Sequence, residues 1–219
     1  MENSLLNFVL GAGISGGVLG ALIGVFLGHR LAVSLFRERS KALENAFYND
    51  FSILKDDLIS WFPALLEEYR DPLKQSYSGP APLDLKLIEN LIVELAGTDR
   101  MISPDQRMLV SRMERLIEGI KNKDKKRDIY IKRWLENKEE LNGSEKIDIS
   151  SNISFITAQL LVDVSKGIYF LDKVLSERNK FAISDDSSIL TFMKHACSAT
   201  NSNFDREECS AIVRRLGPD

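Results

Sequence analysis

The side chains best suited to metal or proton chemistry are the two histidines and the two cysteines. Imidazole nitrogen and thiolate sulfur are preferred zinc ligands, so His195, Cys197 and Cys209 are candidates for one metal site. Their spacing matches no standard zinc pattern and no fourth ligand is evident, so we expect helix packing roles and no metal. Two cysteines are too few for a disulfide framework, and free thiols are expected if this region is cytosolic. His29 borders a long uncharged segment, where we expect an interfacial role.

Neighbouring carboxylates recur along the chain, and paired acids are the usual apparatus of general acid–base catalysis. Adjacent residues on a helix point about 100° apart, so we interpret these pairs as solvated faces. The pairs are Asp56-Asp57, Glu67-Glu68, Glu139-Glu140 and Glu207-Glu208. The sequence also lacks a Walker loop, an H-E-x-x-H motif and a G-x-S-x-G motif. We therefore expect a protein that is not an enzyme and has no cofactor.

A glycine motif near the N-terminus offers one alternative. Gly11, Gly13 and Gly16 form G-x-G-x-x-G after an apolar run, which resembles the dinucleotide fingerprint of flavin and nicotinamide enzymes. The resemblance implies a nucleotide fold at residues 11–16, with Glu38 as the ribose-binding acid. Three features count against it: the following helix has no polar face, the acid comes late, and no alternation of strands and helices follows. Nucleotide binding stays a distant alternative.

The segment from Leu5 to Gly28 contains no charged side chain. As a helix of ~1.5 Å per residue it is long enough for a hydrocarbon core of ~30 Å. No basic residue precedes it, and it is longer than the apolar core of a signal peptide. We therefore predict a retained transmembrane helix over residues 5–29, with residues 1–4 outside the cytoplasm.

Basic residues follow this segment and predict its orientation. Arg30, Arg37, Arg39 and Lys41 lie on its C-terminal side, with only Glu38 opposing them. Positively charged flanks stay in the cytoplasm. We predict a single-pass protein of the plasma or inner membrane, with its N-terminus outside and its C-terminal domain cytoplasmic.

Small residues recur every fourth position inside the predicted span, which places them on one helix face. The row is Ala12, Gly16, Gly20, Gly24 and Gly28. In lipid, such a groove lets a second helix approach closely. We therefore predict helix packing along this row, with another copy of the chain or with a partner membrane subunit.

Residues 30–70 are predicted to form an amphipathic connecting helix, because apolar residues recur at helical spacing from Leu43 to Trp61. Pro63 predicts a kink or break near residues 60–62. Residues 71–82, rich in proline, form the clearest loop.

Residues 71–219 are predicted to form a cytosolic all-α bundle of five or six helices. Ser103 and Gln106 form a capping box before a long helix. An apolar stripe that includes Ile129 follows and is expected to end at Gly143. We expect a polar linker at residues 144–151, and then a long apolar-striped helix capped by Ser150 or Ser151. Two shorter helices are expected, one from Ser184 and one after Asp205. Earlier in the chain, residues 83–96 are expected to form a helix with Leu87 facing inward.

Residues 121–133 are strongly basic, and the long helix either passes through them or breaks there. The residues considered for contact with anionic lipid or an acidic partner are Lys121, Lys123, Lys125, Lys126 and Arg127. A solvated helix is the default interpretation. The formal net charge of −3 argues against a nucleic-acid partner.

These patterns favour a membrane-anchored scaffold or adaptor that associates through its transmembrane glycine face and presents a helical interaction domain. The alternative is a membrane pore gated by the cytosolic domain, although one apolar helix supplies no polar lining.

Overall fold

The computed structural model describes residues 2–100, 102–184, 187–203 and 205–216, with side-chain surroundings from Gly24 onward. Within these ranges the regular elements are helices and no strand occurs. The prediction of an all-α protein is therefore confirmed. The elements are α1 (Glu2–Arg70), α2 (Lys86–Leu95), α3 (Pro104–Asn137), α4 (Gly143–Glu177), the 3₁₀ helix η1 (Arg178–Lys180), α5 (Ile189–Ala199) and α6 (Arg206–Leu216).

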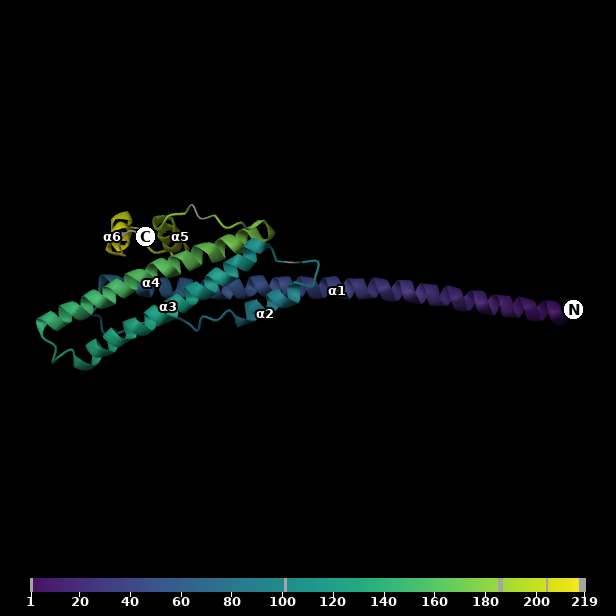
Figure 1. Ribbon diagram of the computed structural model, residues 1–219, viewed down its shortest axis with the longest axis horizontal. Coiled ribbons are helices and arrows are strands. Elements are labelled where there is room, and N and C mark those ends of the chain that lie inside the picture. Colours follow the sequence, from purple (N-terminus) through teal and green to yellow (C-terminus); the bar gives the residue numbers. More distant parts are fainter. Residues whose placement is uncertain (1, 101, 185–186, 204, 217–219) are drawn as a thin grey trace.

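Helix α1 is a 69-residue rod whose C-terminal half belongs to the bundle and whose N-terminal half projects away from it (Figure 1). Of the two outcomes predicted at residues 60–62, a kink or a break, the break is wrong, because α1 continues through Pro63. A proline inside a helix costs about 3 kcal/mol. Trp61, Phe62 and Leu65 are all buried around it, and their packing offsets that cost.

Four helices form the bundle, in the spatial order α1, α4, α3 and α2, with α2 packing back onto α1. Helix α3 runs parallel to α1, whereas α4 and α2 run in the opposite direction (Figure 1). Helices α1 and α4 approach closely at Gly167, where an added Cβ would lie 2.7 Å from Leu58 Cδ1. The predicted apolar stripe of α4, from Ile153 to Val174, is buried along its length and forms the centre of the core.

Helix α3 passes without a break through the basic residues 121–133. Its predicted capping box is confirmed, since Ser103 Oγ accepts from the Gln106 backbone N–H at 3.2 Å and Gln106 Oε1 accepts from the Ser103 N–H at 2.9 Å. Gln106 also donates from Nε2 to Tyr48 Oη at 2.9 Å. One side chain thus caps α3 and joins it to α1.

The predicted linker at residues 144–151 is wrong. Helix α4 begins at Gly143, with Asn142 as its N-cap and Glu145 completing a capping box. Gly143 therefore opens this helix, and the expected caps Ser150 and Ser151 lie inside it. The polar residues at the start of α4 are exposed or half-buried, because the first turns of this helix lie at the end of the bundle.

Two shorter helices, α5 and α6, pack on the outside of α4 (Figure 1). Helix α5 starts at Ile189 with Ser188 as its cap, so the predicted start at Ser184 is early. Helix α6 starts at Arg206, as expected from Asp205.

Two residues that were predicted to face inward are exposed. Leu87 of α2 is 60% exposed and Ile129 of α3 is 66% exposed.

Among the described residues, the helical stretch Gly143–Lys180 is long and apolar enough to cross a membrane by length and composition alone. However, 67% of its apolar window is buried inside the protein, as expected for the central helix of a bundle. The side chains of residues 5–23, which make up most of the predicted span, lie outside the described residues. The backbone of residues 11–16 is helical within α1, which does not match the strand-to-helix turn of a dinucleotide fingerprint.

Candidate functional site

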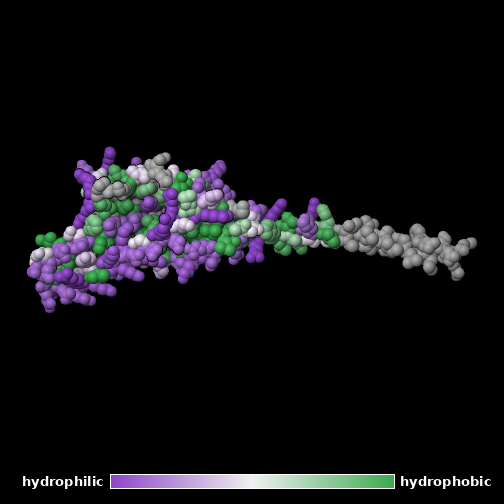
Figure 2. Space-filling model, in the orientation of Figure 1, coloured by the Kyte–Doolittle hydropathy of each residue, from purple (hydrophilic) through white to green (hydrophobic). Residues whose placement is uncertain are grey.

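The projecting part of α1 exposes apolar side chains. Val25, Leu27 and Leu31 are 72%, 59% and 62% exposed, and Leu35 and Phe36 also face outward. Figure 2 shows hydrophobic colour on the described part of this rod next to the bundle, interrupted by hydrophilic side chains. Single exposed apolar residues are common on folded proteins, but a continuous apolar surface marks a membrane or protein contact.

The two glycines of the predicted row that the structure describes lie on this rod. At both Gly24 and Gly28 an added Cβ would meet nothing within 4 Å. Both positions are therefore open to an approaching helix. Ala12, Gly16 and Gly20 continue the row along α1, but their surroundings lie outside the described residues.

The predicted basic flank lies where the rod approaches the bundle. The Arg30 guanidinium lies 4.6 Å from the Phe26 ring centroid, so charge and apolar surface are adjacent. Arg39 forms an exposed ion pair with Glu94 at 3.5 Å. Arg37 and Lys41 are exposed. These four side chains lie within about three turns of the helix, and we call them the basic collar.

The five basic residues grouped on α3 do not form one surface. Lys121, Lys125 and Lys126 are exposed, and Lys123 pairs with Asp163 of α4. Arg127 is only 1% exposed, so its assignment as a contact for lipid or an acidic partner is wrong. Its position on α3 points the side chain into the bundle and away from solvent.

Arg127 is the centre of a buried polar cluster. Its Nη1 donates to both carboxylate oxygens of Glu68, at 3.1 and 3.0 Å. Its Nη2 donates to Asp124 Oδ1 at 2.7 Å and to the Ser78 carbonyl at 3.1 Å. Thr157 of α4 donates to Glu68 Oε1 at 2.5 Å. The interpretation of Glu68 as part of a solvated acidic pair is therefore wrong.

Burial raises the pKa of Glu68, while Arg127 and the Thr157 hydroxyl oppose that rise. Asp124 lies three residues before Arg127 on α3, but Glu68 and Thr157 come from two other helices, so no local spacing in the sequence reveals that Arg127 is buried. The signal it does contain is an arginine within a lysine-rich run, since arginine is the usual cation of buried ion pairs.

The loop between α1 and α2 crosses this cluster. Its Ser78 carbonyl accepts hydrogen bonds from Arg127 and from Trp61 Nε1, the latter at 2.8 Å. Its Lys74 carbonyl accepts from Trp134 Nε1 at 3.1 Å. These bonds fix the predicted loop to both α1 and α3, so it forms part of the folded bundle.

The residues considered as metal ligands separate into two places. Cys197 and Cys209 are buried, free and hydrogen-bonded to each other between α5 and α6. That hydrogen bond lowers the pKa of Cys197 and, together with burial, raises the pKa of Cys209. His195 Nε2 lies 3.3 Å from Asp172 Oδ2 of α4. Within the described ranges no cluster of three or more suitable ligands exists.

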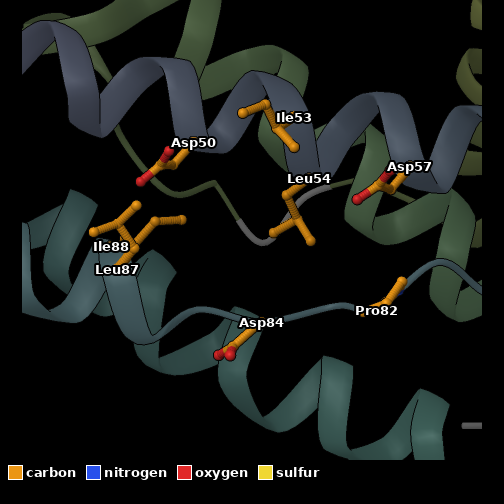
Figure 3. A pocket seen from close by; sticks show the side chains of 8 residues that line it. All are labelled: Asp50, Ile53, Leu54, Asp57, Pro82, Asp84, Leu87 and Ile88. Atoms are coloured by element: carbon orange, nitrogen blue, oxygen red, sulfur yellow. The ribbon is translucent and has the colours of Figure 1, made fainter.

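A small cleft lies between α1 and the start of α2, with a cavity volume of about 130 Å³. Three carboxylates surround it, from Asp50 and Asp57 of α1 and from Asp84 just before α2 (Figure 3). Leu54 and Ile88 provide apolar walls. We call this the acidic groove.

The carboxylates of the acidic groove differ in their surroundings. Asp50 Oδ2 is buried without a hydrogen-bond partner, and burial raises the pKa of Asp50. Asp84 Oδ1 accepts from the Lys86 backbone N–H at 3.0 Å, and that bond lowers the pKa of Asp84. Asp84 thus supports the start of α2, whereas Asp50 has an unused acceptor.

A second cleft, with a cavity volume of about 380 Å³, lies between α3 and α4. Its walls include Leu109, Leu116 and Phe170. Its charged side chains are all basic and are those of Arg112, Arg115 and Lys166. We call this cleft the basic groove. Sequence spacing did not predict either groove, because each combines residues from two helices.

Comparisons with known proteins add no further identification: no protein family, no curated protein and no solved structure matches this chain.

Proposed function

We propose that this chain is a single-pass membrane scaffold or adaptor that associates through the glycine face of α1 and presents its helical bundle to partners. The observation that carries the proposal is the exposed apolar rod. It is continuous with a core helix of the bundle, and its described glycines are open. A soluble protein would rarely leave such a surface uncovered.

The proposed orientation rests on charge. The basic collar of Arg30, Arg37, Arg39 and Lys41 follows the uncharged segment, and residues 1–4 before that segment contain Glu2 and no lysine or arginine. Basic flanks stay in the cytoplasm, so the bundle is cytoplasmic in this proposal. The partners of the rod are membrane lipid and either further copies of the chain or another membrane subunit.

Glycine spacing supports association of the rods. Each interior glycine costs a water-exposed helix about 1 kcal/mol relative to alanine. In lipid the same glycines let two backbones approach, so that dispersion and weak Cα–H contacts stabilise the pair. A row of four glycines in register is therefore better explained by helix packing than by chance.

The experiment is detergent extraction of the full chain followed by mass measurement of the intact complex. We expect the chain to remain with membranes until detergent is added, and to be released as an oligomer or with a co-purifying subunit. The double variant Gly20→Ile/Gly24→Ile should reduce the mass of the extracted complex. Leu22→Ile, off the glycine row, is the matched control and should leave the mass unchanged.

Two outcomes would contradict the proposal. Recovery of the chain in the soluble fraction without detergent would exclude the membrane anchor. An unchanged mass for the glycine variant would exclude the packing face. Leakage from liposomes that contain the purified chain would instead favour the pore alternative.

A further inference from the structure

The acidic and basic grooves lie on opposite sides of the bundle. Helices pack in the order α1, α4, α3 and α2 around its axis. The acidic groove occupies the junction of α1 with α2, and the basic groove occupies the junction of α3 with α4. In a ring of four helices these two junctions face away from each other.

The two grooves also lie at the same height along the bundle. Tyr48 and Glu68 of α1 contact Gln106 and Arg127 of α3, at sequence offsets of 58 and 59 residues. Because α1 and α3 run parallel (Figure 1), this nearly constant offset places α1 residues 50–57 level with α3 residues of about 108–116, at ~1.5 Å per residue. Those two segments carry the acidic and basic grooves.

The position of each groove along the bundle axis matters because a membrane anchor gives every copy of α1 the same direction. Chains inserted with one orientation have parallel rods, so a groove on one copy faces a neighbour's surface at the same distance from the membrane. A contact between two different faces of identical chains is heterologous, and it closes into a ring if the rotation allows. Matching heights and opposite sides are the geometry that such a contact requires.

We propose that the acidic groove of one copy docks into the basic groove of the next, so that parallel copies assemble side by side; this inference rests on the proposed membrane anchor. Arg115 and Lys166 of one copy face Asp50 and Asp57 of its neighbour. Exposed apolar side chains beside the grooves add contact area, with Ile53 61% and Met108 45% exposed.

The accessible carboxylates of the acidic groove fit this arrangement. Asp57 is half-buried and Asp84 is exposed, so guanidinium or ammonium groups of a neighbouring copy can reach them, whereas Asp50 Oδ2 is buried within its own chain. Complementary charge across an interface gives specificity and a dependence on salt. Like-charged faces, in contrast, would repel, which disfavours pairing of two acidic grooves.

Zero-length carbodiimide coupling tests the contact, because it joins a carboxylate to an amine only when the two touch. Full-length chains, one population isotope-labelled, are mixed in detergent and then coupled. We expect mixed-label peptides that link Lys166 to Asp57 or Asp50. The pair Lys55 and Asp172, 2.9 Å apart within one chain, is the positive control and should give links within single chains.

Charge variants make the test directional. Arg115→Glu/Lys166→Glu alters only the basic groove, and Asp50→Asn/Asp57→Lys alters only the acidic groove. Each variant alone should lose the cross-links between grooves, because one groove is altered in every copy. A mixture of the two should recover cross-links from Lys166 of the acidic-groove variant to Asp57 of the basic-groove variant, because one intact groove of each kind remains. Circular dichroism and the melting temperature show whether each variant is folded. If the Asp57→Lys variant is unfolded, Asp57→Asn replaces it as the milder substitution.

The result that would overturn the inference is the absence of mixed-label links to Lys166 in the unaltered chain, or a failure of the mixed variants to recover links between Lys166 and Asp57. The proposed anchor is judged separately. If the extracted complex remains oligomeric and sensitive to Gly20→Ile/Gly24→Ile while no such link forms, only the groove contact fails. If the chain needs no detergent, the anchor fails as well.

Discussion

Arg127 and Glu68 form an ion pair in which each side chain is only 1% exposed, and this pair connects α3 to α1. Both of those helices pack on α4. Removing two charges from water is costly, so a buried ion pair contributes to a specific arrangement more than to net stability. In this bundle it fixes the height of α3 relative to α1.

The first prediction concerns the removal of one side chain from the Arg127–Glu68 ion pair. Arg127→Met should lower the free energy of unfolding by about 3–5 kcal/mol, because Glu68 is then buried without its cation. Lys126→Met, at an exposed neighbouring position, should change it by less than about 0.5 kcal/mol. Thermal unfolding of the full chain in detergent, followed by near-UV circular dichroism, measures both. The double variant Arg127→Met/Glu68→Leu should recover most of the loss. Equal losses in the single and double variants would contradict the idea of an uncompensated charge.

The second prediction concerns pH and Asp50. Burial raises the pKa of Asp50 above its ordinary value of 3.8. For a carboxyl with a raised folded-state pKa, the folded state binds more protons than the unfolded state. Its stability contribution is then fully present below 3.8 and is lost as pH rises through the folded-state pKa. Asp50→Asn should therefore match the unaltered chain at pH 3.5 and be more stable at pH 7. Melting temperatures at the two pH values provide the measurement, and a variant that is less stable at pH 7 would contradict it.

Helical periodicity predicted most of the fold because the bundle is built from apolar stripes. The stripe from Phe47 to Trp61 and the stripe of α4 are buried as expected. The capping box at Ser103 was also predictable, since its hydrogen bonds are local. Local rules failed where distant residues decide the outcome. Pro63 remains helical because Phe62 and Leu65 are packed on both sides of it.

Charged residues were harder to place than apolar ones. A basic run and an acidic pair both indicate solvent exposure on average, yet Arg127 and Glu68 are buried because they form an ion pair across the bundle.

The role of Gly143 was predicted wrongly for a different reason. Glycine is frequent after a helix end, but Asn142 and Glu145 form a capping box that starts α4 at that point. That capping box is a local signal in the sequence. The two grooves depend on the spatial order of the helices, which periodicity does not specify.

The third prediction compares two helical glycines. An added Cβ at Gly167 would lie 2.7 Å from Leu58 Cδ1, and Leu58 is fully buried, whereas at Gly119 nothing lies within 4 Å. Gly167→Leu should destabilise the bundle by at least about 1–3 kcal/mol through overpacking between α1 and α4. Gly119→Ala should stabilise it by up to about 1 kcal/mol, because alanine favours the helix. Unfolding midpoints measure both variants. Equal effects at the two sites would contradict the close approach of α1 and α4.

The last prediction concerns the attachment of α6. Arg70 of α1 holds Glu208 of α6 through two hydrogen bonds, at 2.7 and 2.6 Å, and Cys209 is buried directly beside this pair. Arg70→Ala should weaken the docking of α6 and increase its local opening. The thiols Cys197 and Cys209 should then react faster with iodoacetamide, and Cys197 should react first because its hydrogen bond with Cys209 lowers its pKa.

Peptide mass spectrometry over time measures this reaction at each thiol. Arg133→Ala is the matched control, since it removes an exposed arginine–carboxylate pair with Glu145 at the far end of α3 and should leave both rates unchanged. Faster labelling in both variants would indicate general destabilisation of the bundle. Unchanged labelling in Arg70→Ala would show that α6 is held by its apolar contacts, chiefly through the buried Ile212, and that the ion pair contributes little.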